Sequence, residues 1–307
     1  SLNLLKLIEK KVDWHVYFAI LILLLSPILD RWSFTDVTGD LSVSLLQGNV
    51  DQNTKWRPEN RRQIFADYVE LSKTEQGRDL IVWPEASLTF LRESIASELS
   101  IYGKNLGDEG TGLIFGIPSL TEDGYFQNTL LGIGRAEGTY IKRQLVPFGE
   151  FVPMEKHLRG IISFFDLPMS RNTPGPSVQS PLTINGNEFS SSICYEIAYP
   201  DLVRSADSDP AFILTVSNDT WFGSSIGPWQ HLQLARMRAM ENERTLVRAT
   251  NNGITAVISS QGQIIASLPQ FTRGVLRYDL EMRSGKTPFQ RFGSWPILFL
   301  AVAILVF

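Results

Sequence analysis

The stretch SSICYEIAYPD, residues 191–201, contains Cys194, the only cysteine in the chain. Its apolar, hydroxyl-rich beginning predicts a buried strand that ends at Ile193 and delivers the cysteine to the strand's carboxyl end. A free cysteine is commonly a small buried hydrophobic residue, and this interpretation competes with that of a nucleophile. The choice between them depends on the rest of the chain.

Strand-like and helix-like segments alternate on both sides of this stretch. Helices between strands predict an α/β domain in which helices cover the faces of a sheet, and glycine-containing turns between extended runs predict a mixed sheet. In such folds ligands bind beyond the carboxyl ends of the strands. The expected strands are 41–47, 79–83, 112–118, 125–135, 140–146, 211–217, 245–251, 254–260, 263–268 and 275–280, and the expected helices are 58–76, about 197–206 and 228–245.

The two ends of the chain are more apolar than its middle. Residues 14–29 are almost wholly apolar and follow three lysines, and residues 295–307 are apolar to the last position. A membrane-spanning helix needs about 20 apolar residues. A secretory signal is the alternative for the first run, but no small-x-small cleavage site follows it. Lysines before the first helix predict that the middle of the chain lies on the outer side of a membrane.

These features predict five parts in the chain. They are a membrane helix at 1–30, a connector at 31–40, a central α/β domain at 41–283, a connector at 284–294 and the start of a second membrane helix at 295–307. The apolar C-terminus also predicts that the chain is part of a longer protein.

Composition excludes several classes of function. The chain of 307 residues is 43% hydrophobic and 20% charged with a net charge of −4, which is typical of a globular protein and gives no basic excess for nucleic acid. One cysteine excludes an intrachain disulfide, and three histidines without C-x-x-C or H-E-x-x-H spacing argue against a metal site. We therefore expect no metal and no cofactor.

A nucleophilic cysteine needs a group that accepts its proton. The histidines are poor candidates, because His15 lies in the first apolar run and His157 in a basic segment. His231 lies near the start of a long predicted helix, where a packing or surface role is expected. Glu85 follows the apolar strand 79–83 directly, and partial burial there would favour its neutral form. A carboxylate at a helix N-terminus is the alternative interpretation of Glu85.

Lys142 lies in the otherwise apolar run 140–146. An ammonium beside Cys194 would lower the pKa of the thiol and, together with the backbone N–H of Tyr195, would stabilise an oxyanion. Glu150, eight residues further on, could pair with Lys142. The alternative interpretation of Lys142 is a solvated strand lysine, and that of Glu150 is a residue in a surface ion pair.

The order W-P-E, then a lysine in an extended run, then I-C-Y-E-x-x-x-P resembles the nitrilase superfamily. The resemblance implies a Glu-Lys-Cys triad on a four-layer α-β-β-α sandwich. By position, Glu85 matches the general base, Lys142 the lysine that binds the oxyanion, and Cys194 the nucleophile.

Longer motifs look like the apolipoprotein N-acyltransferase branch, in an order that covers about residues 41–283. The branch implies substrate-binding roles for Trp56, Phe148 and Trp221, and supporting roles for Glu150, Tyr195 and Glu196. Its members carry several membrane helices before this domain, so we expect this chain to be a C-terminal portion. The motifs are QGNVDQNTKW (47–56), LVPFGEFVP (145–153), SSICYEIAYPD, SNDTWFGSSIGPWQHLQLARMRA (217–239) and LVRATNNGITAVISSQG (246–262).

The resemblance implies transfer of an acyl chain from a phospholipid, through a thioester on Cys194, to the α-amine of the N-terminal diacylglyceryl-cysteine of an apolipoprotein. It also implies a multi-pass protein of the bacterial inner membrane with its catalytic domain on the periplasmic side. The apolar stretch LRGIISFFDLP (158–168) is either a lid that enters the bilayer surface or ordinary core. Two alternative functions are a membrane-tethered amidase with the same triad and an inactive binding module.

Overall fold

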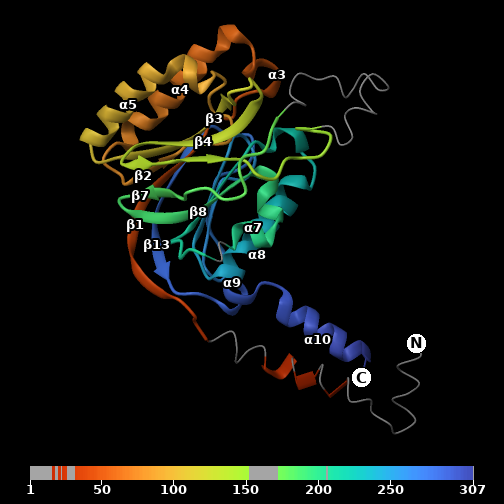
Figure 1. Cartoon of the computed structure of the whole chain (residues 1–307). Coiled ribbons are helices and arrows are strands. Elements are labelled where there is room, and N and C mark those ends of the chain that lie inside the picture. The colour runs from red at the N-terminus through yellow and green to blue at the C-terminus, as the bar shows by residue number, and fades with distance from the viewer. Residues whose placement is uncertain are drawn as a thin grey trace, which may run out of the picture.

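The structure is a computed structural model that describes residues 32–151, 172–204 and 207–306, with short stretches at 16–17, 20–21 and 23–25. Among the described residues, the strands form one sheet of six and one of seven strands. The two sheets face each other, and helices cover their outer faces (Figure 1). This is the four-layer α-β-β-α sandwich that the resemblance implies.

The first sheet contains both parallel and antiparallel neighbours, as the turn pattern predicts. β1 pairs with β2 in parallel and with β13 in antiparallel orientation, and β2 pairs with β3 in parallel orientation. In sheet order its strands are β13 (Gly274–Ser284), β1 (Asp36–Gln47), β2 (Leu80–Val82), β3 (Gly112–Leu120), β4 (Phe126–Gly134) and β6 (Thr139–Ile141).

The second sheet is also mixed. Its central strands β8, β9 and β10 are parallel, and antiparallel strands flank them on both sides. In sheet order its strands are β12 (Ile264–Ser267), β11 (Ala256–Ile258), β10 (Leu246–Thr250), β9 (Ile213–Ser217), β8 (Asn187–Ile193), β7 (Leu182–Ile184) and β5 (Ala136–Glu137).

Alternation along the strands produces three apolar layers, because successive side chains point to opposite faces of a sheet. In β2, Leu80 and Val82 pack between the two sheets, whereas Ile81 packs under the helices that cover the first sheet. In β9, Leu214 lies between the sheets and Ile213 lies under the helices of the second sheet. Each fully buried aliphatic side chain contributes about 1.5–3 kcal/mol to stability.

Helices α4 and α5 cover the first sheet, and α7 and α8 cover the second (Figure 1). Short 3-10 helices precede or follow several of them. The helices are α3 (Gln52–Lys55), η1 (Pro58–Asn60), α4 (Arg61–Ser72), η2 (Lys73–Glu75), η3 (Arg92–Ile95), α5 (Ala96–Asp108), η6 (Cys194–Ala198), α7 (Pro200–Val203), η7 (Asp219–Phe222), α8 (Gly227–Asn242), α9 (Pro288–Phe292) and α10 (Trp295–Val306).

The chain ends differ in part from the sequence expectation. β1 begins at Asp36, within the expected connector 31–40, and α9 lies within the expected connector 284–294. None of the helices in the described ranges is long and apolar enough to cross a membrane. Most of the predicted membrane helix at 1–30 lies outside the described residues, so this helix and the one at 295–307 stay predictions.

Candidate active site

Glu85, Lys142 and Cys194 follow three different strands, and the fold brings them together. Glu85 comes three residues after β2, while Lys142 and Cys194 come directly after β6 and β8. Nζ of Lys142 lies 3.7 Å from Oε1 of Glu85, and the charges of both groups act on the thiol of Cys194. The carboxyl ends of strands from both sheets therefore form one candidate site.

Glu85 is buried, and each of its carboxylate oxygens accepts a hydrogen bond. Nδ2 of Asn128, in β4, donates to Oε1 at 2.8 Å, and the backbone N–H of Asn218 donates to Oε2 at 2.7 Å. Below it, Gly116 of β3 lies so close that a Cβ there would be 2.8 Å from Cα of Glu85. The sequence interpretation missed these partners, because no local pattern connects them with Glu85.

Lys142 is almost fully buried between two carboxylates. Its ammonium donates to Oε1 of Glu150 at 2.8 Å, and Oε2 of Glu150 accepts the backbone N–H of Val146 at 2.9 Å. Burial by itself lowers the pKa of Lys142, but the charges of Glu85, Cys194 and Glu150 outweigh it and raise this pKa. Lys142 is therefore a permanent cation, and its predicted pairing with Glu150 is confirmed.

Cys194 is half-buried and has φ of 53°, in the left-handed region that residues other than glycine rarely adopt. Burial raises the pKa of its thiol to about 12; the charge of Glu85 also raises it, while that of Lys142 lowers it. The expected effect of Lys142 on this pKa has the right sign. Because burial and Glu85 dominate, the net shift of this pKa is upward, and the thiol needs a proton acceptor in order to react near neutral pH.

Glu196 links the segment after Lys142 to the turn at Cys194. Its buried carboxylate accepts the hydroxyl of Tyr140 at 2.9 Å and the backbone N–H of Ile193 at 2.8 Å. It also accepts two further backbone N–H groups, those of residues 143 and 144. Glu196 thus contacts the backbone beside Lys142, and its supporting role stays a prediction.

His231 is buried beside this site, so the expected surface role is wrong, whereas the expected packing role agrees with its burial. The ring is buried at the start of α8, where Nε2 lies 3.0 Å from the carbonyl oxygen of Cys194 and Nδ1 lies 3.0 Å from Oδ1 of Asp219. Its place in the sequence, at the start of a long helix, gave no signal for this contact. His231 contacts the backbone of Cys194, which differs from the Cys-His pair of a papain-like site.

The expected substrate-binding residues are three aromatic side chains in different environments. Trp56 is half-buried, and its indole N–H is buried without an acceptor in the described part of the chain. Phe148 is 47% exposed and has φ of 63°, and Trp221 is 72% exposed. Tyr195 makes an edge-to-face contact with Tyr199 at 5.2 Å. His157 and the expected lid 158–168 lie outside the described residues.

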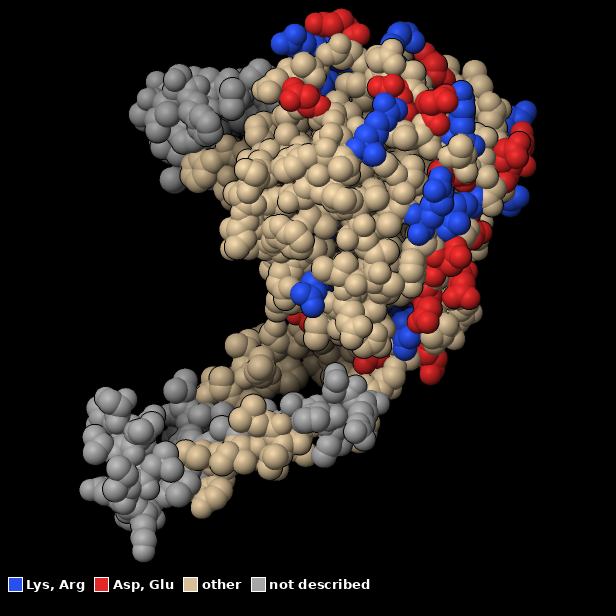
Figure 2. Space-filling model, turned by 180° about the vertical axis from the view of Figure 1, so that it is seen from behind, with Lys and Arg blue, Asp and Glu red and all other residues tan. Residues whose placement is uncertain are grey.

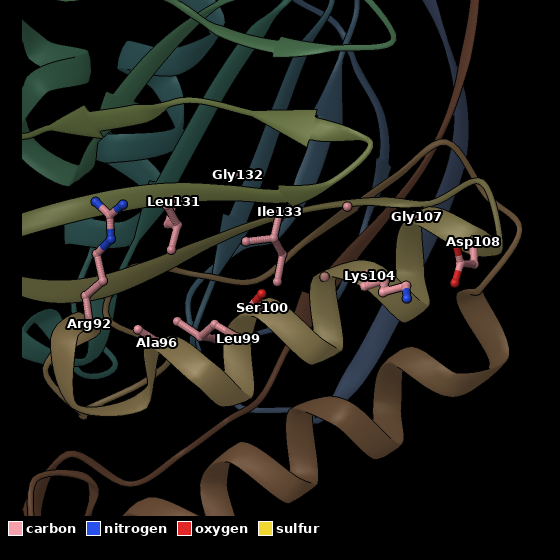
Figure 3. A pocket seen from close by; sticks show the side chains of 12 residues that line it. Arg92, Ala96, Leu99, Ser100, Lys104, Gly107, Asp108, Leu131, Gly132 and Ile133 are labelled. Carbon is pink, nitrogen blue, oxygen red and sulfur yellow. The ribbon is translucent and has the colours of Figure 1, made fainter.

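A pocket of about 570 Å³ lies between α5 and β4 (Figure 3). Arg92, Lys104 and Asp108 are the charged side chains of its lining, which includes none of the three triad residues. Within the described ranges, no group of three or more His, Cys, Asp or Glu residues is arranged to bind a metal ion.

Known proteins resemble this chain in sequence and in fold. The profile of the carbon-nitrogen hydrolase family matches residues 42–287. An apolipoprotein N-acyltransferase of Pseudomonas syringae pv. tomato is 44% identical over 86% of this chain and 53% of its own length. One of Vibrio vulnificus is 42% identical over 90% of this chain and 57% of its own length. The chain therefore spans little more than half the length of these relatives.

Solved structures of the nitrilase superfamily share the fold at low sequence identity. Nit3 of Saccharomyces cerevisiae has a TM-score of 0.57 and 19% identity, over 80% of this chain and 91% of its own. An amidase of Nesterenkonia has a TM-score of 0.55 and 21% identity, over 81% of this chain and 94% of its own.

Proposed function

The chain belongs to the carbon-nitrogen hydrolase family, and on this premise we propose that it catalyses N-acylation of apolipoproteins. In this reaction a fatty acyl chain moves from a phospholipid to the α-amine of an N-terminal diacylglyceryl-cysteine. The similarity to apolipoprotein N-acyltransferases over most of the chain carries the proposal. The geometry of Glu85, Lys142 and Cys194 supports it.

The first half-reaction forms a thioester. Glu85 accepts the thiol proton as the sulfur of Cys194 attacks the ester carbonyl, and a carbon–sulfur bond forms. Lys142 and the backbone N–H of Tyr195 stabilise the oxyanion. Glu85 then protonates the departing alkoxide, the carbon–oxygen bond breaks, and a lysophospholipid leaves.

The second half-reaction transfers the acyl chain to nitrogen. The α-amine of the diacylglyceryl-cysteine attacks the thioester carbonyl, and Glu85 accepts the proton that this amine loses. The same two donors stabilise the second oxyanion. The carbon–sulfur bond breaks, the thiol of Cys194 is restored with the proton from Glu85, and an amide remains on the apolipoprotein. Each step uses only groups of the chain and the two substrates.

Exposed apolar side chains near the site support a lipid substrate. Trp221, Phe222, Ile226 and Trp229 are between 42% and 72% exposed and belong to η7, the turn after it and the start of α8. Figure 2 shows that charged side chains gather along one edge of the molecule, and that the side from which α10 projects carries few of them. Tryptophan is enriched where proteins meet the membrane interface. We assign this side to the membrane surface.

The proposed setting is the bacterial inner membrane, with the site on the periplasmic side. The relatives named apolipoprotein N-acyltransferase are bacterial. The apolar runs at 14–29 and 295–307, with lysines before the first, support a multi-pass topology of this orientation.

A labelling experiment tests the proposal. The chain in mixed micelles is incubated with a phospholipid labelled in its acyl chains, and protein-bound label is measured before and after hydroxylamine. We expect hydroxylamine-sensitive label on the wild type, its absence from Cys194→Ala, and its transfer to a diacylglyceryl-peptide as an amide. Label on Cys194→Ala would refute the role of Cys194. Release of ammonia from small amides without any lipid label would instead favour the amidase.

A further inference from the structure

The backbone carbonyl of Cys194 points to the ring of His231, and this contact determines the direction of a neighbouring N–H group. We propose that His231 is a positioning residue: by donating to this carbonyl it fixes the peptide between Cys194 and Tyr195 so that the N–H of Tyr195 faces the oxyanion. The inference rests on the proposed acyl transfer. It adds a role for a residue that neither takes the thiol proton nor contacts the substrate.

The direction of the hydrogen bond follows from the chemistry of its two atoms. Nε2 of His231 lies 3.0 Å from the carbonyl oxygen of Cys194. A carbonyl oxygen can only accept, so Nε2 is the donor. The peptide is planar and trans, since the described residues contain no cis peptide bond. In a trans peptide the C=O and the N–H point in opposite directions, so His231 determines where the N–H of Tyr195 points.

This peptide needs such a contact because its first residue is strained. Cys194 has φ of 53°, a left-handed conformation that is unfavourable for a residue other than glycine. Relaxation of φ of Cys194 to negative values would reorient the peptide that follows and turn the N–H of Tyr195 away. On the other side of the turn, Glu196 accepts the backbone N–H of Ile193 at 2.8 Å. His231 and Glu196 therefore fix the strained turn from two sides.

The ring of His231 is itself fixed by buried charged groups. Its Nδ1 lies 3.0 Å from Oδ1 of Asp219 and 3.1 Å from Nη2 of Arg248, which also donates to Oδ2 of Asp219 at 2.7 Å. Ser217 donates to Oδ1 of Asp219 at 2.6 Å. Burial raises the pKa of Asp219, but Arg248, His231 and Ser217 outweigh it and hold this pKa well below its usual range. The ring therefore rests on a permanent carboxylate.

Two amide variants separate the proposed contact from mere filling of space. In His231→Gln the side-chain amide nitrogen lies about as far from Cα as Nε2, so it can still donate to the carbonyl of Cys194. In His231→Asn the nitrogen lies about as far from Cα as Nδ1, so it reaches Asp219 and falls short of the carbonyl. Complete loss of one oxyanion donor slows catalysis about 100–1000-fold. In His231→Asn and His231→Ala the N–H of Tyr195 is misdirected but still present, so we expect thioester formation to be about 10–100-fold slower. We expect it within about threefold of wild type in His231→Gln.

Alkylation of Cys194 by iodoacetamide is the control reaction, because displacement of iodide forms no oxyanion. We expect its rate at pH 9 to change less than about threefold in all variants, and the phospholipid concentration for half-maximal labelling to stay the same. Thermal unfolding verifies that each variant is folded. If alkylation and thioester formation slow together, or if His231→Asn equals His231→Gln, the inference is wrong. Absence of label on the wild type would instead refute the proposed function.

Discussion

Glu85 and Asn218 follow strands of different sheets, and a hydrogen bond of 2.7 Å joins them across the sandwich. The backbone N–H of Asn218 fixes one oxygen of the carboxylate, and Asn128 of β4 fixes the other. The direction of the proposed base therefore depends on the packing of both sheets.

Replacing Glu85 with glutamine should remove the proton acceptor and preserve the shape of the site. We expect thioester formation to slow at least about 100-fold, since general base catalysis contributes about 100–10,000-fold. The NH₂ group of the glutamine would also point at Asn128 or Asn218, whose N–H groups now donate to Glu85. One of these donors would lose its acceptor, which should cost about 1–3 kcal/mol in unfolding free energy. Single-turnover labelling and urea denaturation measure the two effects. Glu98→Gln, at an exposed carboxylate of α5, is the control and should change neither.

The pH dependence of alkylation should report the raised pKa of Cys194. With this pKa at about 12, the thiolate fraction grows with pH throughout the accessible range. The alkylation rate should therefore rise roughly tenfold per pH unit between about pH 8 and pH 10. Lys142→Met removes a positive charge that lowers this pKa, so its rate should be lower at each pH. A plateau near pH 9 in the wild type would contradict the assignment.

Trp83 should stabilise the fold, whereas Trp221 should act on lipid alone. Trp83 is fully buried, stacks on Tyr68 at 5.1 Å between ring centroids and donates to Oγ of Ser72 at 2.9 Å. We expect Trp83→Ala to lower the unfolding free energy by about 3–5 kcal/mol. Trp221→Ala, at a side chain that is 72% exposed, should change it by less than about 0.5 kcal/mol and weaken use of micellar phospholipid. Equal lipid use by Trp221→Ala and wild type would contradict the membrane assignment.

Gly116 should be intolerant of even a methyl group, because the backbone of the Glu85 loop lies against it. A Cβ at this position would lie 2.8 Å from Cα of Glu85 and from the carbonyl oxygen of Pro84. We expect Gly116→Ala to displace Glu85, slow labelling at least tenfold and cost about 1–3 kcal/mol. In α5, Gly107→Ala meets its nearest neighbour at 3.6 Å, an ordinary contact, so it should be neutral or stabilising by up to about 1 kcal/mol. Similar losses of labelling rate and stability in both variants would show that the close contact of Gly116 with the Glu85 loop is not the cause.

Most helices and strands could be predicted from the sequence, and so could the candidate residues Glu85, Lys142 and Cys194, because each leaves a local pattern. Hydrophobic periodicity predicts the helix at 58–76, and the structure has α4 flanked by η1 and η2 there. Cys194 directly follows the apolar run that ends at Ile193, and Lys142 lies inside the apolar run 140–146. In such folds ligands bind beyond the carboxyl ends of strands, which makes both residues candidates for the site. The pairing of Lys142 with Glu150 is also local, since eight residues separate the two.

The partners of these residues could not be predicted, because they meet only through packing. Asn128 and Asn218 lie 43 and 133 positions from Glu85, and nothing in their own neighbourhoods points to it. His231 fits an ordinary helix position, and only the fold places its ring against Cys194. The net direction of the pKa shift of Cys194 depends on burial, which a charged neighbour in the sequence does not reveal.

The hydrogen bond between Glu85 and Asn218 has a consequence for inactivation by heat. Because groups from both sheets orient the carboxylate, the proposed catalytic arrangement should not survive separation of the two halves of the sandwich. Loss of thioester-forming capacity on heating should then coincide with the cooperative melting of the domain, with no inactive but folded species before it. Residual activity is in that sense a measure of the folded fraction.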